Sequence, residues 1–406
     1  MLDTKKTVII FFIFYLAFEI ALYMLVGLRH PLWGDEHHFV PTVQEFGQNL
    51  TLQQLKTYNE MSTPLPFVLY ALWGKTVGFQ LYSLRLFSIF IAFTTCITYY
   101  FLFKMIFRKY NYAVLLTALL MFQPYMIGLT VFVFTDMLPL LFLGIGIIAT
   151  KHKKPLLFFL AGAAALLCRQ YYIFFIVASF LYFCLIWFKE KDRDTASMIA
   201  STFLSALPLT GLFILWNGLT PQNEMKLHYM DRTFQFHPTS FILYLSLFFV
   251  YLFPVILVRW KDYFVSTKRL ILSLIISVLY IFYPVHASEP AIRLNNVFTV
   301  GFFHKFIRKT VGEQFEHLIF YLALLLSLPV ILYIAEKTLF NIRNNHYGWT
   351  VFSGLGILCF LLIMPLSYLH WEKYFLPVIP LAAIHLLITG KTDIPTLISV
   401  PSGRQK

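Results

Sequence analysis

Long apolar runs recur along the whole chain, and they constrain its fold more than any other feature of the sequence. The first run covers residues 7–28 and contains one charged residue, Glu19. A run of this length crosses a hydrocarbon core of roughly 30 Å as a single helix. Only 13% of all residues are charged, against about a quarter in soluble domains, so we predict an all-α membrane protein.

The runs predict about twelve transmembrane helices. They cover residues 7–28, 83–107, 112–128, 134–150, 155–168, 171–188, 196–216, 240–259, 269–286, 318–336, 349–368 and 374–390. Long polar segments remain at residues 29–82, 217–239 and 287–317. No repeat of fixed period and no low-complexity linker divides the chain, so residues 1–406 are predicted to form one domain.

The distribution of charge predicts the orientation. With the N-terminus inside and the spans alternating, nearly all of the +13 net charge falls on loops that the positive-inside rule assigns to the cytoplasm. Residues 29–82 then form the first outer loop. Within it, residues 58–74 fit a helix at the membrane interface, although ordinary loop packing explains them as well. The sequence shows no clustered basic face on an exposed domain, which argues against a nucleic-acid partner.

Ionisable and amide side chains gather at the outer ends of the predicted spans. A charged group at membrane depth is costly unless it is paired or lines a wet cavity. Their convergence on one leaflet therefore predicts a cavity open to the outer side. The side chains are those of Asp35, Glu36, Asp136, Arg169, Gln170, Asn217, Arg293, Glu372 and Lys373.

The stretch 33-WGDEHHF-39 places two acids and two histidines directly after the first span. Asp35 and Glu36 are sequence neighbours, so on a helix their side chains point about 100° apart and do not form a dyad. An acid held near apolar walls has a raised pKa and is a better general base. The same residues also fit a solvated acidic turn. His37 and His38 suggest a metal site, but no second histidine or cysteine cluster is evident.

Arg169 lies between two short spans and must pair or reach an interface. Its forked donors suit a phosphate group, and a structural pair with an acid such as Asp136 explains it equally well. Asp136 opens a span, where an acid also serves as a helix cap. Trp216, Asn217 and His228 are typical of sugar-binding sites, although the membrane interface favours tryptophan by itself.

Residues 286–309 carry four basic side chains on the predicted outer side, Arg293 among them, and strain the positive-inside rule. Either residues 291–303 cross the membrane, or an amphipathic basic segment lies on the outer surface. Such a segment would suit anionic lipid head groups. Further on, Glu372 and Lys373 open the last span, where they also fit pairing at the interface.

Five stretches resemble, in the same order, the dolichyl-phosphoglucose-dependent α-1,2-glucosyltransferases of the endoplasmic reticulum, which belong to the GT-C class. The match at 283–298 is faint, because the family's "DNRHY" is absent there. The matching stretches are GDEHHFVPTVQ at 34–44, NEMSTPLPFVLY at 59–70, RQYY at 169–172, WNGLTPQNEMKLHYMD at 216–231 and YLHWEKYFLPVIP at 368–380.

The resemblance implies GT-C architecture with a helical first outer loop. Such an enzyme takes a sugar from a polyprenyl phosphate on the outer or luminal side and inverts the anomeric carbon. It implies Asp35 as general base, with Glu36 as the second candidate, and Arg169 and Arg293 as donor-phosphate ligands. Contacts to the sugar or the acceptor are implied for Asp136, Gln170, Trp216, Asn217, His228, Glu372 and Lys373.

The resemblance leaves the cofactor, the acceptor and the compartment open. Metal dependence varies within the class, so no metal ligand is predicted and a divalent cation is neither required nor excluded. The partners implied are a polyprenyl-phosphate sugar, a glycan acceptor that is lipid-linked in the family, and membrane lipids. The shorter chain favours a bacterial plasma membrane over the endoplasmic reticulum. The competing functions are a transporter or flippase of lipid-linked sugars, and a glycan polymerase or ligase that uses a diphosphate-linked donor.

Overall fold

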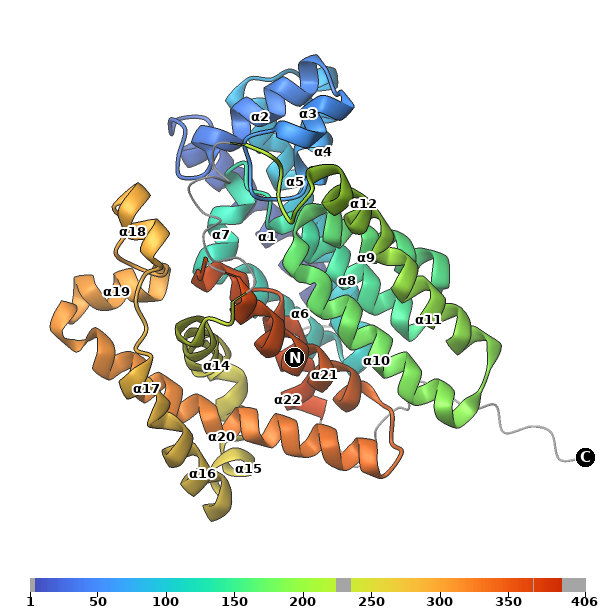
Figure 1. Cartoon of the computed structure of the whole chain (residues 1–406), viewed down its shortest axis with the longest axis vertical. Coiled ribbons are helices and arrows are strands. Elements are labelled where there is room, and N and C mark those ends of the chain that lie inside the picture. Colours follow the sequence, from blue (N-terminus) through green and yellow to red (C-terminus); the bar gives the residue numbers. More distant parts are fainter. Residues whose placement is uncertain (1–3, 224–234, 368, 389–406) are drawn as a thin grey trace, which may run out of the picture. The chain divides into compact units, whose positions relative to one another are not determined.

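The computed structural model describes residues 4–223, 235–367 and 369–388, and in these ranges it contains helices and no strand, as Figure 1 shows. This confirms the predicted all-α class. The chain groups into two compact units. Unit 1 comprises residues 1–176 and 200–231, and unit 2 comprises residues 177–199 and 232–406. The prediction of a single domain stays a prediction.

The described helices are those of a multi-pass membrane protein, as predicted. Seven segments are long and apolar enough to cross a membrane, and a bent pair of helices would make an eighth. The seven are Lys5–Gly27, Leu81–Phe107, Gln170–Glu190, Arg193–Trp216, Pro238–Val258, Glu313–Arg343 and Trp349–Leu366.

The apolar runs predict about twelve spans, whereas the described residues contain seven or eight helices of full spanning length. The runs at 134–150, 155–168 and 374–390 correspond to shorter helices: α8 (Met137–Lys151), α9 (Pro155–Cys168) and α22 (Val378–Ile388). The run at 269–286 is divided between α16 (Thr267–Ser277) and α17 (Leu279–Phe282). Apolar length alone does not show where a helix breaks, so the sequence overestimates the number of full-length spans.

A proline bends the third predicted span. The bent pair consists of α6 (Tyr110–Met121) and α7 (Pro124–Val131), whose axes differ by 74°. Proline lacks a backbone N–H and disfavours helical geometry in the residue before it. Pro124 therefore ends one helix and starts the next, so that the run at 112–128 is two short helices.

In unit 1, α5 (Leu81–Phe107) packs against α6, α7 and α8, and α8 in turn packs along α9. The N-terminal helix α1 (Thr4–Leu22) contacts α6 and continues into a π-helical turn at Tyr23–Gly27. The boundary between the units falls within α10 (Ile173–Glu190) and α11 (Arg193–Ser205), and α12 (Leu207–Trp216) belongs to unit 1.

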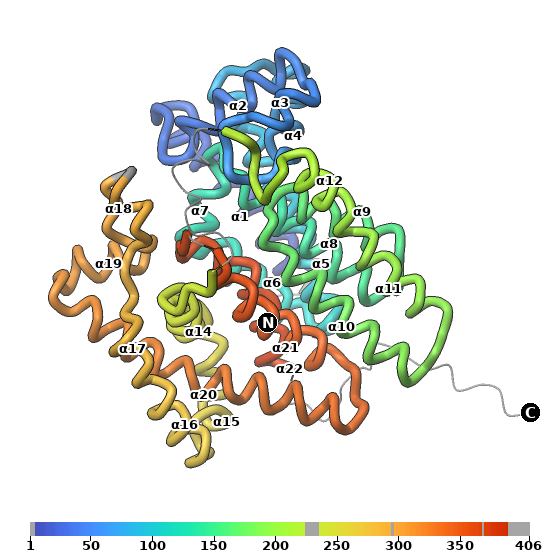
Figure 2. Tube along the Cα trace, in the orientation of Figure 1, coloured from blue at the N-terminus to red at the C-terminus, as the bar shows by residue number. Residues whose placement is uncertain are grey.

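The first predicted outer loop is helical, which confirms that part of the predicted architecture. It contains α2 (Glu36–Gln48), α3 (Leu52–Thr57) and α4 (Leu65–Val77), drawn in blue and lying together at one end of unit 1 in Figure 2. We call these three helices the cap. Thr51 starts α3 by accepting a hydrogen bond from the Gln54 amide at 3.1 Å.

A phenylalanine ring holds two helices of the cap together. A Cβ atom on Gly47 of α2 would lie 2.2 Å from Phe79 Cζ, and a Cβ atom on Gly74 of α4 would lie 2.4 Å from Phe79 Cε1. Real Cβ atoms do not approach so closely, so the two glycines make the space that the ring fills.

Unit 2 is built around α20 (Glu316–Arg343), which packs against α14 (Pro238–Val258), α16 and α21 (Trp349–Ile363). Ser327 ties two of these helices: its hydroxyl donates to the Ser246 carbonyl at 3.1 Å and accepts from the Phe249 amide at 2.8 Å. Further short α-helices of this unit are α15 (Trp260–Phe264), α18 (Glu289–Asn295) and α19 (Phe302–Thr310).

The basic segment at 286–309 contains no helix long enough to cross a membrane, so its residues 291–303 do not form a span. It contains the amphipathic helix α19 instead. Phe302 and Phe306 are exposed on this helix beside Lys305, and Ile307 is buried. The expected contact with anionic lipid head groups stays a prediction.

Candidate active site

Glu36, the second candidate for the base, begins α2 and is fully buried against Arg85 of α5. The Arg85 Nε and Nη2 groups both donate to its carboxylate, with Nε 3.0 Å from Oε1. The backbone amides of Trp33 and Val133 donate to the same carboxylate at 3.0 and 2.8 Å. Glu36 therefore accepts four hydrogen bonds.

Arg85 is fully buried as well, and its remaining donors hold the turn before α2. Nη1 donates to the carbonyls of Gly27 and His30 at 2.9 and 2.7 Å, and Nη2 donates to the Pro31 carbonyl at 2.9 Å. All five N–H groups of the guanidinium are thus used. The Arg85–Glu36 pair fixes the chain from the end of α1 to the start of α2.

Asp35, the first candidate for the base, immediately precedes α2. Its side chain is 38% exposed, and it does not cap the helix by a hydrogen bond. The carboxylate Oδ1 lies 3.9 Å from His38 Nε2, one helical turn further on. Because Asp35 and Glu36 point to different sides of the chain, the buried acid is held in a network while its neighbour is open to solvent.

His38 connects Asp35 to a second, buried carboxylate, that of Glu60. His38 Nδ1 lies 2.9 Å from each Glu60 carboxylate oxygen, and the Thr42 hydroxyl donates to Glu60 Oε1 at 3.2 Å. Burial lowers the pKa of His38, but the interactions with Asp35 and Glu60 outweigh this effect and raise the pKa to about 9.

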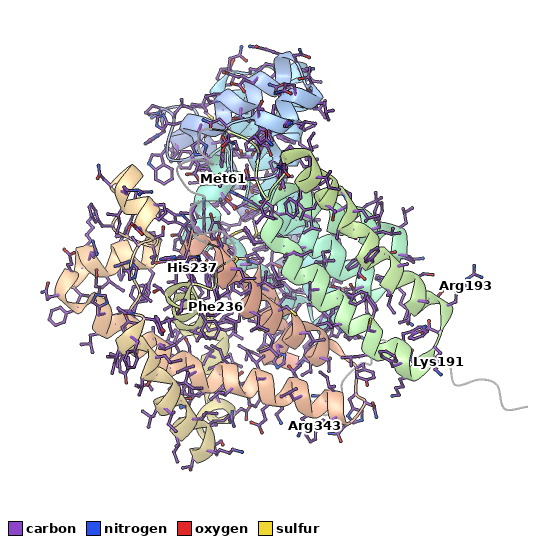
Figure 3. All side chains as sticks on the ribbon, viewed as in Figure 1. Met61, Lys191, Arg193, Phe236, His237 and Arg343 are labelled. Carbon is purple, nitrogen blue, oxygen red and sulfur yellow. The ribbon has the colours of Figure 1, made fainter. Side chains whose placement is uncertain are left out.

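Glu60 lies in a segment that two amide side chains hold in place. Asn223 Nδ2 donates to the carbonyls of Tyr58 and Glu60 at 2.6 and 2.9 Å. Gln170 Nε2 donates to the Met61 carbonyl at 2.9 Å, and Figure 3 labels Met61 at the foot of the cap. These contacts give Gln170 a role in positioning the Glu60 segment, while its predicted contact with a sugar stays a prediction.

Arg169 forms an ion pair with Asp136, which is the structural pair that the sequence offered beside phosphate binding. Arg169 Nη2 lies 3.0 Å from Asp136 Oδ2, and both side chains are largely buried. The ionisable groups in this part of unit 1 thus form two linked sets, Asp35–His38–Glu60 and Arg169–Asp136, and Arg169 attracts Glu60 electrostatically.

Trp216 and Asn217 end α12 in different environments. Trp216 is fully buried, and its indole Nε1 donates to the Leu55 carbonyl in the cap at 2.8 Å. Asn217 is exposed and takes the left-handed conformation that ends a helix, with φ of 48°. The predicted site residue His228 lies outside the described residues.

The other predicted site residues belong to unit 2. Glu372 is fully buried and accepts hydrogen bonds from the Tyr251 hydroxyl at 2.8 Å and from the amides of Phe303 and His304 at 2.8 and 2.9 Å. These amides form the N-terminus of α19, so the carboxylate caps that helix from another part of the chain. Lys373 is half-buried over the Tyr374 ring, and Arg293 is exposed in the last turn of α18.

A second ion-pair cluster holds α19 from its other end. Arg308 binds Glu316 through Nε and Nη2, and His304 Nε2 lies 2.9 Å from Glu316 Oε2. The Val300 amide donates to His304 Nδ1 at 3.2 Å, so the neutral ring carries its proton on Nε2 and donates to Glu316. Burial lowers the pKa of His304, in agreement with this neutral form.

Sequence reasoning missed Arg85 and Glu60 as members of the site. Arg85 lies at the start of the apolar run 83–107, where a charged residue signals a buried partner. Glu60 lies in the quoted stretch 59–70, but nothing in the sequence distinguishes it from a loop acid. No group of three histidine, cysteine or acidic side chains within the described ranges could hold a metal ion, and metal dependence stays untested.

Comparison with known proteins adds little to this geometry. No protein-family model matches the chain, and no curated protein matches it. ArnT from Cupriavidus metallidurans in the apo state is a solved structure that aligns with it, covering 95% of this chain and 78% of ArnT. The sequence identity is 10% and the TM-score 0.39, values at which the alignment establishes neither a common fold nor a common activity.

Proposed function

We propose that this protein is an inverting membrane glycosyltransferase that moves a hexose from a polyprenyl phosphate to a glycan acceptor. The five ordered sequence stretches favour the GT-C class, glucose as the sugar and an acceptor linked to lipid. The charge distribution favours an exoplasmic active site, in a bacterial plasma membrane or, in a eukaryote, the endoplasmic reticulum. The observation that carries the proposal is the half-exposed Asp35 carboxylate on a turn fixed by the buried Arg85–Glu36 pair.

In the proposed reaction, Asp35 accepts the proton of the attacking acceptor hydroxyl. The acceptor oxygen forms a bond to the anomeric carbon, while the bond from that carbon to the phosphate oxygen breaks and its electron pair leaves with the polyprenyl phosphate. Glu36 supports the turn, because its carboxylate already accepts four hydrogen bonds. Arg169 contributes positive charge toward the donor phosphate, and Asp136 orients its guanidinium.

The test is donor hydrolysis or transfer by the purified full-length protein in detergent. A panel of short-chain polyprenyl-phosphate hexoses is supplied, and release of polyprenyl phosphate is followed for the wild type, for Asp35→Asn and for Glu45→Gln. Glu45 is an exposed acid of α2 and serves as the matched control. We expect one donor to be turned over, the Asp35 variant to lose at least about 100-fold in rate, and the control to retain the wild-type rate.

Two results would overturn the proposal in different ways. Full activity of Asp35→Asn would remove Asp35 as the base. Absence of turnover with every donor, together with movement of lipid-linked sugars into or across proteoliposomes, would establish the transporter function instead. The fully buried Glu19 in the first span is the feature that favours this alternative, because ionisable groups within spans often lie on transport pathways.

A further inference from the structure

The geometry around His38 points to a role beyond the proposed base. We propose that His38, held by the buried Glu60, is a positioning residue: its imidazolium orients the Asp35 carboxylate for catalysis. The inference rests on the proposed function. Both ring nitrogens lie toward carboxylates, with Nδ1 2.9 Å from each Glu60 oxygen and Nε2 3.9 Å from Asp35 Oδ1.

A charged ring suits the two carboxylates best. An ionised carboxylate only accepts hydrogen bonds, whereas a neutral imidazole has one donor and one acceptor nitrogen. A neutral His38 would therefore direct a lone pair toward Glu60 or toward Asp35. Only the imidazolium presents N–H groups in both directions, so the geometry favours the cation.

The environment of Glu60 makes this arrangement rigid. Glu60 is almost fully buried, with 1% of its surface exposed, and its backbone carbonyl accepts from Asn223. Thr42, one turn after His38 on α2, donates to the Glu60 carboxylate. The ring of His38 also packs edge-to-face on Phe39, with centroids 4.5 Å apart. The Nδ1 nitrogen is thus fixed on Glu60, which leaves Nε2 directed toward Asp35.

The charges that act on His38 come from two parts of unit 1. Asp35 precedes the same helix, and Glu60 lies in the segment between α3 and α4. Arg169, just after α9, attracts Glu60. Glu36 is directed elsewhere, into its pair with Arg85. The net effect of these interactions and of burial is the pKa of about 9 for His38.

The consequence is a high-pH limit to catalysis. His38 does not take the substrate proton; it remains charged while Asp35 accepts the proton from the acceptor hydroxyl. Below pH 9 the imidazolium attracts the Asp35 carboxylate and holds it in place. As the pH rises through about 9, His38 loses its proton, and the attraction that orients Asp35 disappears.

The first measurement titrates His38 without any substrate. The full-length protein carrying His37→Asn is treated with diethyl pyrocarbonate at pH 5 to 10, and mass spectrometry gives the modification rate of His38. The exposed His346 provides the internal reference. We expect the His38 midpoint near 9 and its fall by at least about one pH unit in Glu60→Gln, with no change in Glu45→Gln.

The second measurement is the pH profile of kcat, with the sugar donor that the hydrolysis test selects from the panel. We expect the wild type to lose activity above about pH 9. His38→Asn should lose about tenfold in kcat and lack this alkaline limb, and in Glu60→Gln the limb should begin at least about one pH unit lower. A His38 midpoint equal to that of His346 would overturn the inference, whatever the activity of Asp35. A midpoint near 9 with full activity of Asp35→Asn would instead overturn the proposed function and leave the charged state of His38 intact.

Discussion

The Arg85 guanidinium and the Glu36 carboxylate meet inside unit 1 with both side chains fully buried. Removing one partner of such a pair leaves an uncompensated charge, which costs about 3–5 kcal/mol. We expect Arg85→Met to lower the unfolding temperature markedly. Reaction of the buried thiols of Cys96, Cys168 and Cys359 with a fluorogenic maleimide during heating would measure the change.

A double variant provides the control for this prediction. Arg85→Met combined with Glu36→Gln removes both charges, and we expect it to recover part of the lost stability. Equal unfolding temperatures for the wild type and the single variant would contradict the assigned role of the pair.

The contact of Phe79 with two glycines predicts that two Gly→Ala substitutions change the stability differently. Gly74→Ala places a Cβ atom against the ring at 2.4 Å and should cost about 1–3 kcal/mol. Gly128 lies in α7, where an added Cβ would meet no atom within 4 Å apart from its chain neighbours and the backbone of its own helix. Gly128→Ala should therefore be neutral or stabilising by up to about 1 kcal/mol. The same thermal assay compares them, and equal losses in both variants would contradict the packing described for the cap.

Much of this architecture could be predicted from the apolar runs, because burial in lipid dictates helices and helix length follows bilayer thickness. The breaks could not be predicted in the same way. Pro124 bends one predicted span by 74°, while the run at 269–286 is divided after Ser277 without a proline. The first break has a local cause in proline, whereas no residue type in the second run marks the break after Ser277.

The candidate site was predictable only in part, for a related reason. Asp35, Glu36, Asp136 and Arg169 stand out because charges at span ends are costly. The sequence does not show that Glu36 pairs with Arg85 across 49 residues, or that Glu60 lies against His38. Those pairings depend on tertiary structure. They are the reason why Glu36 is buried while Asp35 stays half-exposed.

The ion pair between Arg169 and Asp136 predicts how donor binding responds to a conservative change. Arg169→Lys keeps the charge but loses the forked donors, so the donor KM should rise about tenfold, or about 1.4 kcal/mol. Arg193, exposed near the start of α11 and labelled in Figure 3, offers the control Arg193→Lys. A lowered unfolding temperature with an unchanged KM would show that Arg169 only supports the fold.

The capping of α19 by Glu372 predicts a local effect on backbone dynamics. Glu372→Gln removes the negative charge next to the helix N-terminus and should speed hydrogen exchange at the amides of Phe303 and His304. Exchange mass spectrometry of the peptide that covers α19 measures this effect. Glu45→Gln, which alters an exposed acid of α2 in unit 1, should leave those two amides protected. Unchanged exchange in the Glu372 variant would assign the acid to another role, such as the predicted contact with a sugar.

His370 predicts a loss of stability in acid. Its Nε2 donates to the His286 carbonyl at 2.7 Å, its Nδ1 has no hydrogen-bond partner within the described ranges, and burial lowers its pKa to about 4. A folded-state pKa below the unfolded value of about 6.5 means that the unfolded chain binds the proton first. The stabilising contribution is therefore complete above pH 6.5 and is lost as the pH falls toward 4, by about 3 kcal/mol.

Carboxylates titrate in the same range, so the comparison requires a variant of this one residue. His370→Gln keeps a side-chain donor for the His286 carbonyl and cannot be protonated. We expect the unfolding temperature of the wild type to fall more steeply between pH 6.5 and pH 4 than that of the variant. If the unfolding temperatures of the wild type and the variant fell in parallel, the prediction would be wrong. The His370 ring would then accept its second proton as readily in the folded protein as in the unfolded chain.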